Sequence, residues 1–110
     1  MIEFYGKADT ASAALYMNKL CKHFAHKIEI QLNTDQAEAH FPYGQCHMQA
    51  SATQLTFVCS APELRGAAMM RFVLEDHLER FARRENLKVQ WDANAPAAYQ
   101  PELKPDQAPS

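Results

Sequence analysis

The sequence has only three cysteines, and their spacing follows no recognised pattern. The three cysteines, Cys21, Cys46 and Cys59, are odd in number and include no C-x-x-C pair. A secreted disulfide framework uses an even set of cysteines, and a zinc knuckle uses closely spaced pairs. Because the sequence fits neither class, we expect three reduced thiols that serve as small core residues.

Long apolar runs and an excess of one charge are also missing. Met1–Lys7 lacks the apolar run of a signal peptide, and no stretch reaches the ~18 apolar residues that a membrane span requires. Residues 1–91 carry ten Lys/Arg and ten Asp/Glu, so this part of the chain is neutral. A neutral domain has no long-range field that attracts nucleic acid or an anionic membrane. We therefore expect a cytoplasmic protein that binds neither.

Recognised catalytic patterns are absent from the sequence as well. It contains only three glycines, with no glycine-rich phosphate loop, no H-E-x-x-H and no nucleophile–His–Asp signature. Cys21 and His23 are two residues apart, and side chains at that spacing on a helix point in different directions. The sequence therefore leaves open whether the protein is an enzyme, and it identifies no cofactor.

Six short segments alternate regularly between apolar and polar residues. Such alternation predicts strands with one buried face. Turn residues separate the middle segments, as in Asn33-Thr34-Asp35. The predicted strands span residues 2–5, 28–32, 37–41, 46–50, 55–59 and 87–91.

Two further segments repeat their apolar residues with the period of a helix. The first begins at about Asp9 or Thr10, either of which is a good N-cap, and reaches about His26. The second opens with S-A-P-E at residues 60–63, which matches a capping box with proline in the first turn. It ends near Asn86, a residue type that tolerates a left-handed backbone.

The predicted elements follow the order strand, helix, four strands, helix, strand. Because each strand has one apolar face, we expect both helices on the same side of the sheet. The sequence thus predicts a two-layer α+β fold in residues 1–91, a mainly antiparallel sheet with two helices packed on one face. Four of the six prolines lie in residues 92–110, which predicts a disordered tail.

Two motifs in the predicted helices stand out, L-C-K-H-F-A-H-K at residues 20–27 and H-L-E-R-F-A-R-R-E at residues 77–85. With V-Q-W at residues 89–91 and the G-Q-C turn after Tyr43, they make most of residues 3–91 resemble the bacterial family called domain of unknown function 2218. In some bacteria similar domains are joined to siderophore-interacting, flavin-dependent ferric reductases. The resemblance implies an accessory role in iron handling, with a siderophore-interacting protein as partner.

His23 and His77 occupy matching positions in the two helical motifs, on the same edge of each apolar stripe. If the helices pack side by side, the two imidazoles would converge on one pocket. The alternative is a structural role, in which each ring donates to a backbone carbonyl. His26, one turn after His23, would complete a three-histidine metal site. Glu85 falls on the apolar stripe two turns beyond His77. It would be either a pocket residue or a residue whose side chain extends to solvent at the helix end.

His40 and His47 form a second histidine pair, on either side of the turn Pro42-Tyr43-Gly44. If Tyr43 and Gly44 make a two-residue loop, the two histidines lie directly opposite each other on the exposed face. Their Cβ atoms would then be about 5 Å apart, close enough to share a metal ion. The alternative is an incidental pair on the surface.

The end of the second helix collects positive charge, and two apolar side chains point away from its buried stripe. Arg80, Arg83, Arg84 and Lys88 would interact favourably with the negative end of the helix dipole. The two apolar side chains, Met69 and Phe72, would offer contacts to a partner or to a second copy of the chain.

Three hypotheses follow from these features. The first is a non-enzymatic binding or accessory module, which the resemblance connects to iron or siderophore metabolism. The second is a small metal-dependent or acid–base enzyme that uses His23 and His77. The third is a homo-oligomerising domain, such as a homodimer. A solvent-open pocket with both histidines would favour the enzyme, and packed histidines beside an exposed apolar patch would favour the oligomer.

Overall fold

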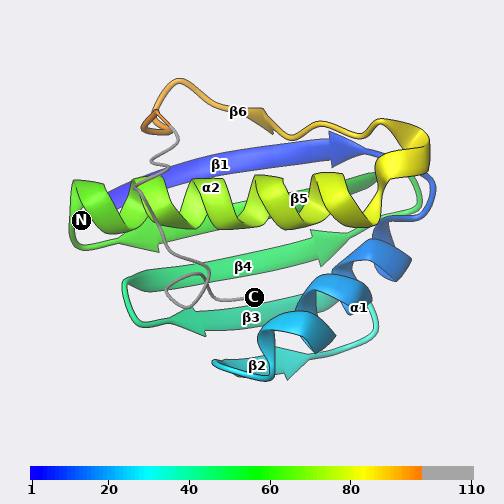
Figure 1. Cartoon of the computed structure of the whole chain (residues 1–110), viewed down its shortest axis with the longest axis horizontal. Helices are drawn as coiled ribbons and strands as arrows, with labels where there is room; N and C mark the ends of the chain where they lie inside the picture. Colours follow the sequence, from blue (N-terminus) through cyan, green and yellow to red (C-terminus); the bar gives the residue numbers. More distant parts are fainter. Residues whose placement is uncertain (98–110) are drawn as a thin grey trace.

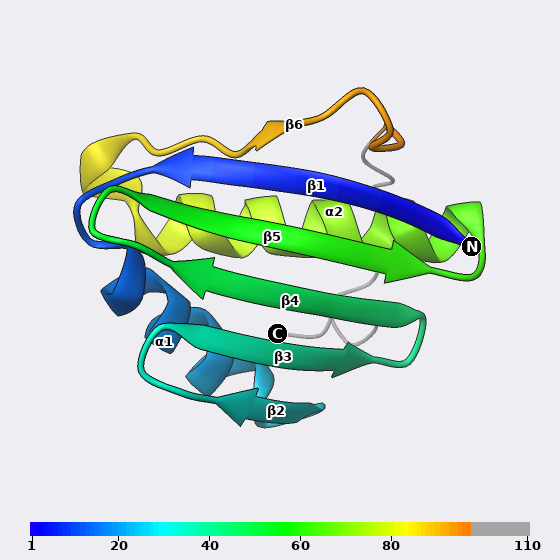
Figure 2. The ribbon, with the colours of Figure 1, turned by 180° about the vertical axis from the view of Figure 1, so that it is seen from behind.

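The computed structural model describes residues 1–97 and has two layers, a six-stranded sheet and two helices. Figure 1 shows both helices in front of the sheet, and Figure 2 shows the uncovered face from behind. The strands lie in the order β2-β3-β4-β5-β1-β6, and every pair is antiparallel. The elements are β1 (Ile2–Asp9), α1 (Ala13–Phe24), β2 (Glu29–Leu32), β3 (Gln36–Phe41), β4 (Gly44–Ala50), β5 (Gln54–Ala61), α2 (Leu64–Phe81), the 3-10 turn η1 (Arg83–Glu85) and β6 (Gln90–Trp91).

The predicted α+β fold and its order of elements are confirmed. Burial alternates along β3, β4 and β5, so every second side chain faces the helices, as the period-two pattern predicts. No helix in residues 1–97 is long and apolar enough to cross a membrane.

The two helices start later than predicted because long-range hydrogen bonds extend the strands before them. The first helix begins at Ala13, not at Asp9 or Thr10, since β1 continues to Asp9 and the Thr10 amide donates to the Thr53 carbonyl. The helix ends at Phe24, two residues before His26.

The predicted capping box at residues 60–63 is wrong. Ser60 and Ala61 belong to β5, where they pair with β1, and α2 begins only at Leu64 with Glu63 in the N-cap position. A strand paired with its neighbour forms ladder hydrogen bonds that a local cap cannot replace. The predicted left-handed residue is confirmed at Asn86, which has a φ of 51° after η1.

One apolar core fills the space between the helices and the sheet. Its largest fully buried side chains include Phe24, Leu20 and Met17 of α1, Leu74 of α2 and Phe57 of β5. The three cysteines are also buried and free, as the sequence predicts. Burial raises the pKa of the Cys21 thiol to about 11, so it stays protonated at neutral pH.

The last strand is anchored by Trp91, whose ring packs on the core. Its centroid lies 5.5 Å from Phe4 and 6.2 Å from Phe57. The Trp91 ring also covers Gly6, where an added Cβ would come within 2.6 Å of the indole. This close approach requires a residue without a side chain in β1.

The contacts of the fold extend past Trp91, where the sequence places the end of the domain. The Asp92 amide donates to the Tyr5 carbonyl over 2.9 Å, and Arg71 Nη1 donates to the Pro96 carbonyl over 2.6 Å. Ala95 packs against the core. The rest of the predicted tail, residues 98–110, lies outside the described residues.

Candidate functional site

The two helices run in roughly opposite directions over the sheet, so the start of α1 lies beside the end of α2 (Figure 1). A hollow of about 660 Å³ opens at this seam, within the size range of small-ligand sites. We call it the interhelical groove. Residues from the exposed edge of α1 and from the last turn of α2 with η1 line it, namely Leu15, Tyr16, Lys19, Arg80, Phe81, Arg83 and Arg84.

Positive charge dominates the interhelical groove. Arg80 pairs with Asp76 one turn earlier, over 3.1 Å. The other three cations, Lys19, Arg83 and Arg84, form no ion pair within residues 1–97. Beside them the groove offers an apolar surface, because the Leu15 side chain is 54% exposed. An excess of cations next to exposed apolar carbon suits a ligand that has both an acidic group and an apolar body.

Tyr16 carries the hydrogen-bonding group at one end of the interhelical groove. Its hydroxyl donates to Glu85 Oε2, and Glu85 Oε1 accepts from Thr10 Oγ1 over 2.9 Å. The pKa of Tyr16 is raised, first by this hydrogen bond to Glu85 and then by burial. Glu85 therefore joins η1 to the start of α1 and lies with Tyr16 rather than with the histidine pair.

The prediction that His23 and His77 come together is confirmed. Their ring centroids lie 4.7 Å apart at the same seam, further along α1 from the interhelical groove. His77 is only 4% exposed, and its Nδ1 lies 2.7 Å from the Val73 carbonyl. The Nε2 atoms of both rings are buried without a hydrogen-bond partner among the described residues.

The surroundings of the histidine pair disfavour a positive charge. The pKa of His23 is lowered, first by burial and then by the nearby His77, His26, Arg80 and Lys27. Phe24 and Phe81 also contact the His23 ring, with centroids at 5.7 and 5.8 Å. His23 is therefore neutral at pH 7.

A three-histidine metal site receives no support from this arrangement. His26 follows the end of α1 and is exposed. In residues 1–97 no three His, Cys, Asp or Glu side chains lie close enough together to hold a metal ion. The positive neighbours of His23 would also oppose a divalent cation.

The predicted direct pairing of His40 with His47 is wrong because the turn is one residue earlier than a Tyr43-Gly44 loop requires. Gly44 pairs with Phe41, so His40 lies opposite Gln45 and His47 lies opposite Glu38. His47 Nδ1 instead pairs with Glu38 Oε1 over 2.5 Å on the uncovered face of the sheet. This is a cross-strand side-chain pair that needs no metal.

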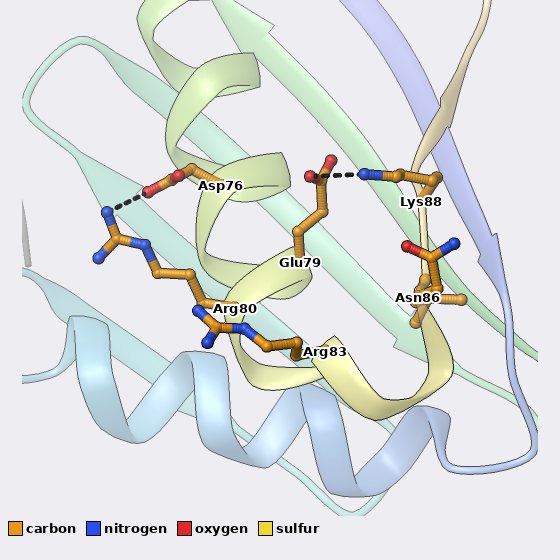
Figure 3. A pocket seen from close by; sticks show the side chains of 7 residues that line it. Asp76, Glu79, Arg80, Arg83, Asn86 and Lys88 are labelled. Atoms are coloured by element: carbon orange, nitrogen blue, oxygen red, sulfur yellow. Dashed lines mark hydrogen bonds and ion pairs between the residues drawn. The ribbon is translucent and has the colours of Figure 1, made fainter.

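The basic group predicted at the end of α2 divides between two hollows. Figure 3 shows the smaller one, of about 370 Å³, which α2 lines together with Asn86, Leu87 and Lys88 of the following segment. There Lys88 pairs with Glu79 and Arg80 with Asp76, each over 3.1 Å, so most of the charge is compensated. Arg80 and Arg83 line both hollows, whereas Arg84 lines only the interhelical groove and Lys88 lines only the smaller hollow.

Met69 and Phe72 do not form the exposed apolar patch that the sequence predicts. Both are half-buried, and Phe72 packs against the core. The sequence pattern did not identify Leu15 and Lys19 as groove residues, because both lie outside the buried stripe of α1 and Lys19 is on the polar face of the predicted helix. Their i, i+4 spacing beside the arginines at the end of α2 is the signal that could have found them.

Comparison with known proteins gives a family and a similar structure. Residues 6–92 match the family described as an uncharacterised protein conserved in bacteria, DUF2218. A similar solved structure is the NMR structure of PA4090 from Pseudomonas aeruginosa, which superimposes with a TM-score of 0.73. The two sequences are 32% identical, and the matched region covers 88% of this chain and 100% of the PA4090 chain. No curated protein matches the chain. With the match over most of its length, the chain belongs to the bacterial DUF2218 family.

Proposed function

We propose that this chain is a non-enzymatic binding module for a small organic anion, which it holds in the interhelical groove. The observation that carries the proposal is the uncompensated charge there. Lys19, Arg83 and Arg84 face the same hollow and make no ion pair within the described residues. Like charges gathered in one place repel each other, and an anion would relieve that repulsion.

The apolar lining narrows the class of ligand. Leu15 and Phe81 border the cations, so an aromatic or branched body can pack beside the charged group. The arginine side chains can also form two parallel hydrogen bonds with a carboxylate, sulfonate or phosphate. The ligand class is therefore an amphipathic organic acid.

An anionic iron–siderophore complex belongs to this ligand class. The family resemblance is the reason to connect such a complex with this chain. The same resemblance is the reason to propose a siderophore-interacting protein as partner. Binding of such a complex, with a desferri-siderophore as the comparison, is the direct measurement of that connection. A homodimer likewise stays a prediction, which light scattering of the purified protein measures.

The test uses 2-naphthalenesulfonate as the probe and follows amide chemical shifts during titration. Each exposed ion pair contributes about 0.2–1 kcal/mol, so the double variant Arg83→Gln/Arg84→Gln should bind about twofold to thirtyfold more weakly. Lys22→Gln is the matched control, because Lys22 is an exposed cation of α1 that does not line the groove. It should bind as the parent does.

The neutral analogue 2-naphthol separates charge from apolar contact. Its affinity should be lower than that of the sulfonate in the parent and equal in parent and double variant. Equal binding of the sulfonate by the parent and the double variant would exclude the interhelical groove as the anion site. Shift changes confined to residues far from the groove would exclude it as well.

The histidine pair favours this module over the acid–base enzyme. The His77 ring is buried, and neither ring lines the interhelical groove or the smaller hollow beside α2. A general acid or base must come within hydrogen-bond distance of its substrate. In this arrangement the pair can act on a ligand only through the residues between them.

A further inference from the structure

The histidine pair has two nitrogen atoms whose hydrogen bonding is incomplete. A carbonyl oxygen can only accept, so His77 carries a hydrogen on Nδ1, toward Val73, and in the neutral ring its Nε2 is an acceptor. That atom and His23 Nε2 are both buried and unpartnered among the described residues, in rings 4.7 Å apart. A buried polar atom without a partner carries a free-energy penalty.

Protonation of His23 would fix its Nε2 as a donor. An imidazolium carries hydrogen on both ring nitrogens, so His23 Nε2 becomes a donor. His77 Nε2, held as an acceptor by the bond to Val73, lies in the adjoining ring. A proton added to His23 therefore places a cationic donor in the ring beside this acceptor, and a turn of the rings would let them form a charge-assisted hydrogen bond, which is stronger than a neutral one.

Positive neighbours oppose that proton when the interhelical groove is empty. His26 and Lys27 approach from the end of α1, and Arg80, paired with Asp76, approaches from α2. Burial is the main cause of the lowered pKa of His23, and repulsion from His77 and from these cations lowers it further.

Within residues 1–97, no strand residue is among the charges that shift the pKa of His23. On the side of the sheet Phe24 packs on Phe41, which stacks on Tyr43. Burial raises the pKa of Tyr43 to about 12, so its hydroxyl stays neutral. The charge balance at His23 is therefore set by the helices and by whatever occupies the groove.

Arg80 and Phe81 connect the histidine pair to the interhelical groove. Both line the groove, and Arg80 is one of the charges that acts on His23. The Phe81 ring lies 5.8 Å from His23 and 6.4 Å from His77, between centroids. An anion in the groove would offset the charge of Arg80 and so reduce the opposition to a proton on His23.

We infer that the interhelical groove takes up its anion together with one proton, which the His23–His77 pair shares. This inference rests on the proposed function, an anion site in the groove. Coupling between two bound species is reciprocal, so the proton strengthens anion binding by the factor by which the anion strengthens proton binding. The favoured ligands are strong organic acids that keep their charge at mildly acidic pH, since only these can gain from the proton.

The experiment measures the affinity for 2-naphthalenesulfonate at pH 7.5, 6.5 and 5.5. The sulfonate does not titrate in this range, so any change comes from the protein. We expect the affinity of the parent to rise about fivefold or more toward pH 5.5, the lower end of typical coupling. His40→Gln should show the same rise, since His40 lies on β3 away from the helices. In His23→Gln the ratio of the affinities at pH 5.5 and 7.5 should fall to that of an uncoupled site, near one.

A second measurement needs no variant. The ring protons of His23, followed by NMR against pH, should show a higher pKa with saturating 2-naphthalenesulfonate than without it. A parent that binds the sulfonate with the same affinity at all three pH values overturns the proton coupling and leaves the anion site intact. The same result follows from an equal rise in the parent and His23→Gln. Loss of binding at every pH overturns the anion site and the coupling together.

Discussion

Replacement of Trp91 by alanine is the sharpest test of how the sheet faces its helices. The substitution removes ring contacts with Phe4 and Phe57 and the contact of the Arg71 guanidinium, whose carbon lies 5.7 Å from the ring centroid. Removal of a core tryptophan costs about 3–5 kcal/mol. Trp91 is half-buried, and its indole N–H has no partner within the described residues, so we expect the lower end, about 3 kcal/mol.

Urea and thermal unfolding of Trp91→Ala measure this loss. In a domain of this size 1 kcal/mol corresponds to about 4–8 °C, so the melting temperature should fall by about 12–24 °C. The control is Val58→Ala, because Val58 lies on β5 but on the uncovered face and is 50% exposed. Its cost should stay below about 1 kcal/mol.

The comparison of the two variants gives a clear refutation. If Trp91→Ala unfolds at the parent's urea midpoint, β6 does not pack its indole on the core and the facing of the sheet is wrong. If Val58→Ala costs as much as Trp91→Ala, the uncovered face is buried in solution. That outcome would indicate a partner or a second copy on it.

Two further predictions concern the pH dependence of stability and the effect of a side chain at Gly44. Since the folded-state pKa of His23 is lowered, the unfolded chain binds more protons as the pH falls below about 6.5, and stability should decrease there. Urea midpoints from pH 8 to 5 measure it, and an unchanged slope in His23→Gln would assign the decrease to other groups. Gly44→Ala should be destabilising by about 1–3 kcal/mol, because its Cβ would lie 2.5 Å from the Ser60 carbonyl oxygen. Thermal unfolding measures this, and a melting temperature equal to the parent's would mean that β4 and β5 separate more easily than the structure indicates.

The interhelical groove and the histidine pair make different demands on the same two helices. The groove needs cations that remain exposed at the start of α1 and at the end of α2. The pair needs imidazoles that the helices pack together. Arg80 belongs to both environments, which is why charge variants of this residue would be harder to interpret than those of Arg83 and Arg84.

Local periodicity was sufficient for the fold class and for the positions of His23 and His77 on matching edges of their helices. Alternation marks the buried face of each strand, and helical spacing puts each histidine on the same edge of its stripe. Both are properties of single elements, so they can be read without knowledge of the neighbours. The left-handed Asn86 was predictable for the same reason, because the preference belongs to the residue itself.

The errors arose where a distant partner overrides a local preference. Residues 60–63 match a capping box, yet Ser60 and Ala61 pair with β1 across the sheet. The pairing of Phe41 with Gly44 shifts the turn by one residue and replaces His40 with Glu38 as the neighbour of His47. A shift of one residue changes every cross-strand pair, and no local pattern records it.

By itself the sequence determined which faces are buried, that two helices cover one sheet, and which edge of each helix carries a histidine. Only the tertiary structure decided that Lys19 and the three arginines at the end of α2 share a groove, and that Glu85 bonds to Tyr16 instead of joining the histidines. Burial follows from the chemistry of each side chain, and therefore appears as a period in the sequence. The identity of a neighbour depends on the direction and packing of two helices whose residues lie far apart in the chain.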